Sequence, residues 1–282
     1  MIDSKHQIGL SLVELMIAMA ISSFLILGIT QIYIDNQRHS LFQQNQSNNL
    51  DSGRFAALLL DQYLGKAGYR RNPSISYEQA FPERAAGGGC MAFSTGSSVT
   101  GLDPTEGTGL CLRYQPQVSG DLDCQGAANK ASFNQAFPPL ASDSLIILAF
   151  KYEADTSTEP QNGRLLCKSL NATNPQFIEQ LNGIADMRLE FGIGNADAFS
   201  KDVTTYTAQA DWSSASGTIR SVRYSLLMTG RSGQRDTNDQ PKVFTDWLAL
   251  APAATRTRLQ NGDNRRIYQV VVGSQSIRNL MP

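Results

Sequence analysis

Histidine is almost absent from this chain of 282 residues, which holds only His6 and His39. Both lie before residue 40, so the rest of the sequence has none. Catalysis of the Ser–His or Cys–His type needs an imidazole as general base. The sequence also has no GxSxG or GxxxxGK[ST] motif. It therefore argues against these chemistries, and we expect the protein not to be an enzyme.

Cysteine is scarce and has no metal-site spacing. The four cysteines contain no CxxC pair, and no histidine lies near them, so a zinc site is not expected. Their even number and wide spacing instead predict disulfides in an oxidising compartment. Four cysteines allow three connectivities, and the spacing alone leaves all three open. The cysteines are Cys90, Cys111, Cys124 and Cys167.

Charge is lacking from Leu10 to Ile34, where Glu14 is the sole formal charge, and proline is absent up to residue 72. The 25 residues of this run would form a helix of roughly 38 Å, enough to cross a hydrocarbon core of about 30 Å. A carboxylate in such a helix is costly and needs a partner. Glu14 is therefore the residue that an account of this protein has to explain.

Three interpretations of residues 1–34 compete. A removed signal peptide would have an apolar region of about 7–15 residues and a small-residue cleavage site, which this longer run does not show. An ordinary membrane anchor fits the length but leaves Glu14 without a role. The third interpretation is cleavage after Gly9, with Leu10 as the new N-terminus. It accounts for the glycine, the apolar run and Glu14 together.

The segment from Gly9 to Ile17, GLSLVELMI, resembles the processing site of type IV prepilins and pseudopilins. The resemblance implies that a prepilin peptidase cuts between Gly9 and Leu10 and methylates the new amine of Leu10. It also implies that Glu14, the fifth residue of the mature chain, pairs with the N-terminal amine of a neighbouring subunit. Such pairing would supply the cation that a buried carboxylate needs.

Beyond Asp35 the sequence turns polar but keeps helical spacing up to about Gly68, where glycines and Pro73 predict a stop. We expect one helix over residues 10–68 whose second half is amphipathic. The residues expected on its buried face are Leu50, Phe55, Leu58, Leu59, Tyr63 and Ala67.

The remaining residues are predicted to form short strands between turns, with long loops at 195–217 and 232–242. The expected strands are Cys90–Ser94, Leu110–Gln115, Ser144–Tyr152, Arg164–Lys168, Met187–Ile193, Thr218–Thr229 and Arg266–Gly273.

Scattered pieces of this region are similar to PilW-type minor pilins. They are Leu112–Tyr114, Asp121–Gly126, Asn162–Cys167, Arg265–Val272 and Ile277–Asn279. The resemblance implies an α+β, pilin-like fold in which the long N-terminal helix packs on an antiparallel β-sheet head with long loops. It divides the chain into a leader (1–9), a transmembrane and fibre-core half-helix (10–34), an amphipathic half-helix (35–70) and a periplasmic head (71–282).

The function implied is that of a minor pilin that helps to prime the type IV pilus and sits at its tip, in motility, adhesion or DNA uptake. The implied location is the inner membrane before assembly and the fibre afterwards. The implied partners are membrane lipid, prepilin peptidase, the assembly platform, the major pilin, other minor pilins and a tip adhesin. Two alternatives stay open: a minor pseudopilin of type II secretion, and a membrane-anchored periplasmic enzyme or ligand-binding protein.

For the disulfides we favour Cys124 with Cys167, which would tie the loop DCQG to the strand after the Asn162–Gly163 turn. Cys90 then pairs with Cys111 by elimination. No cofactor is expected. Oxygen ligands for calcium occur at Asp236, Asn238 and Asp239, but the loop lacks the glycine and glutamate of an EF-hand. Pairs of arginines are scattered along the chain, at Arg70–Arg71, Arg256 with Arg258, and Arg265–Arg266, and the net charge is −1. DNA is therefore not an expected partner.

Overall fold

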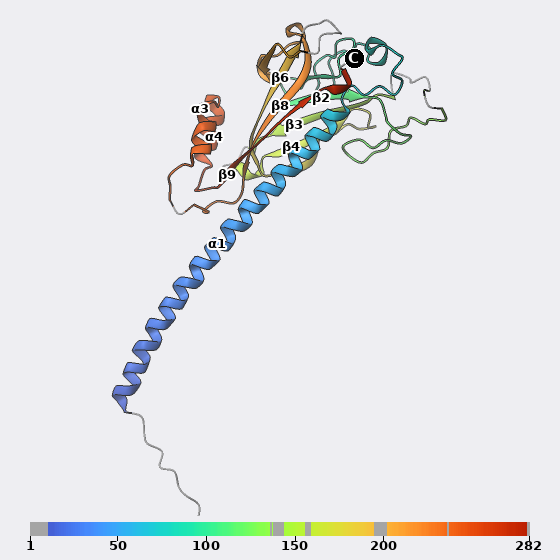
Figure 1. Ribbon diagram of the computed structural model, residues 1–282. Coiled ribbons are helices and arrows are strands. Elements are labelled where there is room, and N and C mark those ends of the chain that lie inside the picture. The colour runs from blue at the N-terminus through green and yellow to red at the C-terminus, as the bar shows by residue number, and fades with distance from the viewer. Residues whose placement is uncertain are drawn as a thin grey trace, which may run out of the picture. The chain divides into compact units, whose positions relative to one another are not determined.

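The computed structural model describes residues 11–135, 137, 144–155, 159–194, 202–235 and 237–280. The chain divides into two compact units, Met1–Gln46 and Ser47–Pro282, and each is treated by itself. The first contains the start of one long helix. The second contains the end of that helix and two antiparallel sheets, with the element order shown in Figure 1.

Helix α1 runs from Leu12 to Lys66 without a break, close to the range predicted. No proline interrupts it, and Lys66 lies in its last turn, where a cation suits the helix dipole. At its end Gly68 takes a positive φ of 74°, which favours glycine. The side-chain amide of Asn279 donates hydrogen bonds to the carbonyls of Gly65 (2.8 Å) and Ala67 (3.1 Å). The C-terminal segment thus satisfies carbonyls that the helix end leaves free.

The described residues of the head form two sheets, both fully antiparallel, where the sequence predicts one. The first has the order β1-β2-β3-β4-β5, with strands Val99–Gly101, Gly109–Tyr114, Ile146–Glu153, Arg164–Ser169 and Ile178–Asn182. The second has the order β7-β6-β8-β9, with β6 at Ile184–Gly194, β7 at Thr205–Ala208, β8 at Thr218–Thr229 and β9 at Tyr268–Ser276. Gly183, with a positive φ, joins β5 to β6 and so links the two sheets.

Residues 47–66 of α1 pack into a core shared by both sheets. Gly53 lies against Val271, so closely that a Cβ atom there would come within 2.5 Å of a Val271 methyl group. Near the helix end, the rings of Tyr63 and Phe150 lie 5.3 Å apart. The buried positions of this part are Asn49, Gly53, Ala56, Leu60, Tyr63 and Leu64.

The predicted buried face of this helix is partly wrong. Tyr63 and Ala67 are buried, but the side chains of Phe55 and Leu58 are 50% and 69% exposed. The buried face instead combines the small Gly53 and Ala56 with the larger Leu60, Tyr63 and Leu64. The helical spacing of apolar residues alone did not show that the sheets would cover this face and leave Phe55 and Leu58 outside.

Two short helices cover the other face of the second sheet, α3 at Lys242–Ala249 and α4 at Ala253–Asn261. Each has a proline as its N-cap residue, Pro241 and Pro252, whose backbone is not yet helical. Their apolar side chains, with Phe244 stacked 4.1 Å from Tyr268, form a separate cluster on Leu227 of β8. A further single turn, α2, spans Tyr77–Ala80. The sequence predicted none of these helices.

Several strand predictions also need correction. The segment Cys90–Ser94 makes only isolated bridges, between Arg84 and Phe93 and from Cys90 to Gly87 and Leu102. Strands β1 and β5 were not predicted, and β7 lies within the predicted long loop, of which residues 195–201 are outside the described residues. These strands are three to five residues long, too short for alternation to stand out from the surrounding loop.

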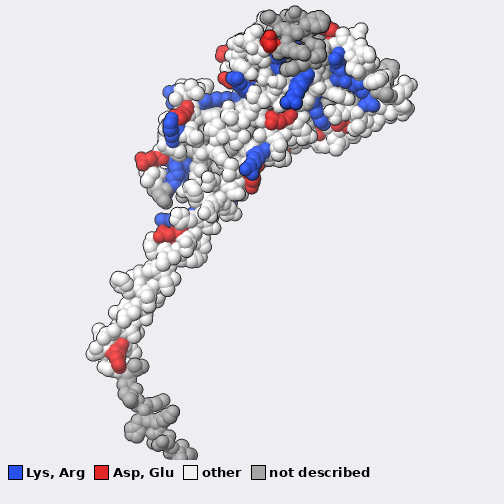
Figure 2. All heavy atoms as spheres, in the orientation of Figure 1, with Lys and Arg blue, Asp and Glu red and all other residues white. Residues whose placement is uncertain are grey.

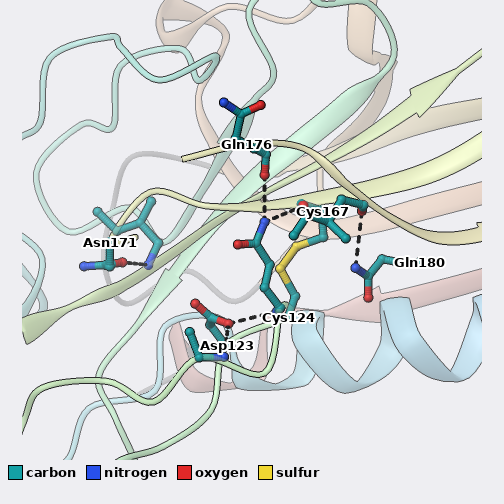
Figure 3. The surroundings of a disulfide bond; sticks show 10 residues. Asp123, Cys124, Cys167, Asn171, Gln176 and Gln180 are labelled. Atoms are coloured by element: carbon teal, nitrogen blue, oxygen red, sulfur yellow. Dashed lines mark hydrogen bonds between the residues drawn. A yellow bond between two sulfur atoms is a disulfide. The ribbon is translucent and has the colours of Figure 1, made fainter. Parts of the chain in front are cut away.

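The disulfides join Cys90 to Cys111 and Cys124 to Cys167, which is the favoured connectivity. Figure 3 shows the second bond. Beside it, the Gln125 side-chain amide donates to the backbone carbonyls of Cys167 (3.0 Å) and Gln176 (2.7 Å). The bond and this amide together fasten the loop DCQG to β4 and to the segment that follows it.

Candidate functional site

The first turn of α1 contains Glu14. Its carboxylate accepts a hydrogen bond of 3.1 Å from the backbone N–H of Ser11, and Leu15 donates to the Ser11 carbonyl at 3.2 Å. The carboxylate thus satisfies one free N–H group, that of Ser11, at the start of its own helix, where the dipole favours negative charge. Ser11 is its one partner among the described residues. Gly9 and Leu10, the predicted processing site, lie outside the described residues.

The helix surface that follows Glu14 is apolar and uncovered. Every large apolar side chain from Leu12 to Ile34 is between 39% and 82% exposed. On the face that Figure 2 shows, this part of the chain is almost free of charged atoms after its first turn. Among the described residues, α1 is the one helix long and apolar enough to cross a membrane. Lipid or other apolar helices are the surroundings that such a surface requires.

The apolar surface ends at Asp35. The Gln31 side chain donates to the Asp35 carboxylate (3.3 and 3.4 Å), and Gln37 donates to the Tyr33 hydroxyl at 3.0 Å. Tyrosine with polar neighbours is typical of a membrane–water interface. After Glu14, Asp35 is the next charged residue of the helix. The division of the helix between residues 34 and 35 stays a prediction.

The head offers no cluster for a metal within the part of the chain that the structure describes. Of the three residues considered for calcium, Asp236 lies outside the described residues. The backbone carbonyl of Asp239 accepts a hydrogen bond from the Arg235 guanidinium.

The arginine doublets have partners inside the fold. Arg70 lies 3.7 Å above the Tyr77 ring, and Arg256 donates to the Leu248 carbonyl at 3.1 Å. Arg266 is fully buried and donates to the Gly262 and Gly230 carbonyls at 2.8 and 2.7 Å and to a carboxylate oxygen of Glu159. These contacts hold loops of the head in place.

One buried carboxylate, Asp186, holds α3 and α4 on the second sheet. It accepts a 2.8 Å hydrogen bond from the Trp247 indole, and the Arg258 guanidinium lies 3.4 Å away. Burial raises the pKa of Asp186, an effect that Trp247, Arg258 and Arg188 oppose. Because its partners come from α3, α4 and β6, the role is to join elements.

Sequence reasoning missed the outward-facing apolar residues of the second half of α1. Phe55 and Leu58 stand three positions apart on one exposed helix face. Their apolar character was visible in the sequence, but nothing there told which face the sheets would cover. The amphipathic half therefore also has exposed apolar side chains, separate from the continuous apolar surface that ends at Asp35.

A family model described as the prokaryotic N-terminal methylation motif matches residues 4–30. This match covers residues 4–9 of the predicted leader, Glu14 and most of the apolar run. No curated protein matches the sequence. Among solved structures, a type IV-like pilin from Thermus thermophilus is similar over 84% of this chain and 99% of its own, at 13% identity and a TM-score of 0.41. That score is too low to establish a common fold, so the methylation motif is the finding that bears on function.

Proposed function

We propose that this chain is a minor pilin of a type IV pilus, of the PilW-like kind. It is cut after Gly9 by a prepilin peptidase and methylated at Leu10. The apolar half of α1 holds it in the inner membrane with its head in the periplasm. It then joins other minor pilins in a complex that primes the fibre and lies at the tip. Its work is recognition between subunits rather than catalysis.

The observation that carries this proposal is the methylation motif on residues 4–30, continued by a helix whose apolar side chains are uncovered. A simple anchor would need the apolar run but not Glu14. In hydrocarbon a carboxylate needs a cation. The amine of a neighbour's Leu10 is a cation that processing itself creates. Glu14 and the cleavage site then serve one purpose, which is to set the position of one helix against the next.

Exchange of the Glu14 carboxylate for an amide tests this pairing. We expect Glu14→Gln to be processed normally but to enter the membrane complex at least ~10-fold less, which corresponds to about 1.4 kcal/mol. The measurement is co-purification of the full chain with the other minor pilins from membranes of the source organism. Asp51→Asn is the matched control, because Asp51 is another exposed carboxylate of α1. A Glu14→Gln protein that joined its complex like the unchanged chain would refute the pairing.

The same purification separates a pilus from a secretion system. We expect the major pilin and the other minor pilins to accompany the chain, together with the assembly platform and a tip adhesin. Co-purification with the pseudopilins of a type II system instead would contradict the pilus assignment. It would leave processing after Gly9 unaffected, because both systems use the same kind of site.

A further inference from the structure

Strand β9 ends the second sheet with one side unpaired. It pairs with β8 along its whole length, from Tyr268↔Thr229 to Ser276↔Ser221. In the order β7-β6-β8-β9 it has no second neighbour. Among the residues that the structure describes, no backbone hydrogen bond reaches its outer side. A row of backbone N–H and C=O groups is therefore free to pair with an extended chain.

This edge is also accessible and carries none of the usual protection. None of residues 269–276 is buried, and the Val272 side chain is 69% exposed. The strand reads YQVVVGSQS, with no charged residue and no proline. Soluble proteins normally shield a long edge with lysine, proline, a bulge or a covering loop. An edge without these features, rich in β-branched valine, is suited to accept another strand.

The other sheet edges are protected, which sets β9 apart. Strand β1 has three residues, all buried, and Met91 donates to the Gly101 carbonyl on its outer side at 3.1 Å. Strand β5 contains Glu179, and the β4–β5 pairing is irregular between Leu165 and Leu166. Strand β7 is only four residues long. The nine-residue β9 is the longest edge among the described strands.

The direction of β9 indicates which kind of partner fits. A Cβ atom on Gly53 of α1 would meet Val271, and one on Gly65 would lie 4.0 Å from the Gln275 side-chain nitrogen. Further along, the Ala67 carbonyl accepts a hydrogen bond from Asn279. The strand therefore runs in the same direction as residues 53–67 of the helix. Two copies paired antiparallel through β9 would set these helix segments in opposite directions. Neighbours whose helix segments run parallel cannot make that pair.

We propose that the free edge of β9 binds an extended, uncharged segment of a different pilin-type subunit, which adds a strand antiparallel to β9. This inference rests on the proposed function, because that function supplies the neighbour. Antiparallel addition continues the pattern of a sheet in which every pair is already antiparallel. Backbone hydrogen bonds provide the attachment, and the lack of charge on β9 selects a segment that is uncharged as well.

Hydrogen exchange in the complex tests the proposal. The full chain is co-expressed with prepilin peptidase and, one at a time, with the full chains of the other minor pilin-type subunits of the same organism, then purified in detergent. With one of them, exchange of amides in residues 268–276 should slow by about 10-fold or more. Exchange in α3, residues 242–249, should not change. A complex that leaves β9 exchange unaltered would overturn the proposal, as would the absence of any complex.

Charge placed on the edge supplies a second test. Val272→Lys and Ser274→Lys should each lower recovery of the complex by about 10-fold. Val272→Thr keeps the β-branched shape without charge and should retain it. Both positions are exposed, so unchanged exchange in α3 will show that the variants fold. Slow β9 exchange in the chain alone, growing with concentration, would show pairing with a second copy and refute the proposal. The N-terminal residue of the same preparations reports separately on the proposed function.

Discussion

At the scale of single residues, Arg113 of β2 shows how the head fixes a long irregular segment. Its guanidinium is 1% exposed and donates to four backbone carbonyls at 2.6–3.2 Å. They belong to Phe81, Pro82, Ser94 and Ser97. Burial, together with the nearby charge of Arg84, lowers the pKa of Arg113 to about 10. A fork of five N–H donors can satisfy several carbonyls at once, and a lysine cannot.

Replacing Arg113 by lysine keeps the positive charge, but it should still destabilise the head strongly. We expect Arg113→Lys to lower the free energy of unfolding by about 2–4 kcal/mol, because buried carbonyls lose their donors. Urea unfolding of the full chain in detergent, with the disulfides intact, measures it. Arg84→Lys, at an exposed position, should change the free energy by less than about 0.5 kcal/mol. Equal effects at the two positions would show that the carbonyl contacts contribute little.

Asp186 should make stability depend on pH in a defined direction. Its folded pKa is raised above the unfolded value, chiefly by burial. The stabilisation that follows is fully present below an unfolded pKa of about 3.9 and is lost as pH rises through the folded pKa. The difference in unfolding free energy between the unchanged chain and Asp186→Asn should therefore fall as pH rises from about 4 to 7. Urea unfolding at several pH values measures it. A difference that grows with pH would contradict the assigned direction.

At the scale of elements, α1 is held on the sheets by close backbone approach. A Cβ atom on Gly53 would lie 2.5 Å from Val271. We expect Gly53→Ala to destabilise the head by about 1–3 kcal/mol through this clash, although alanine favours a helix by about 1 kcal/mol. Gly65→Ala meets no atom closer than 4.0 Å and should be neutral or stabilising. Thermal unfolding of both variants checks the pair. If both substitutions stabilised the head, Val271 would have to move aside for the added Cβ atom at little cost in free energy.

Elements with a long, regular pattern were the ones that could be predicted from sequence. Helix α1 has an uninterrupted proline-free run, and β8 has alternating side chains, so both ranges were close. Strand β5 and helix α4 lack such patterns: β5 has a charged residue and partial exposure throughout, and α4 buries only Leu259. Their conformation depends on tertiary neighbours, which one sequence does not reveal.

At the scale of the whole molecule, the sequence was most informative near the N-terminus. The spacing of Gly9 and Glu14 in an apolar run is a local motif. Such a motif can be recognised in the sequence without knowledge of the fold. The division of the head into two sheets, the free edge of β9 and the outward position of Leu58 arise from contacts between distant segments. Recognition surfaces of the head therefore required the structure, whereas the N-terminal methylation motif was visible in the sequence.

The most direct test of the central claim is the N-terminal residue of the mature protein. The full chain is co-expressed with a prepilin peptidase, recovered from membranes, and analysed by N-terminal sequencing and intact mass. We predict a chain that begins at Leu10 with a methylated amine. An intact Met1, or a cut beyond residue 34, would contradict the account, because Glu14 would then no longer be the fifth residue of a pilin-type helix.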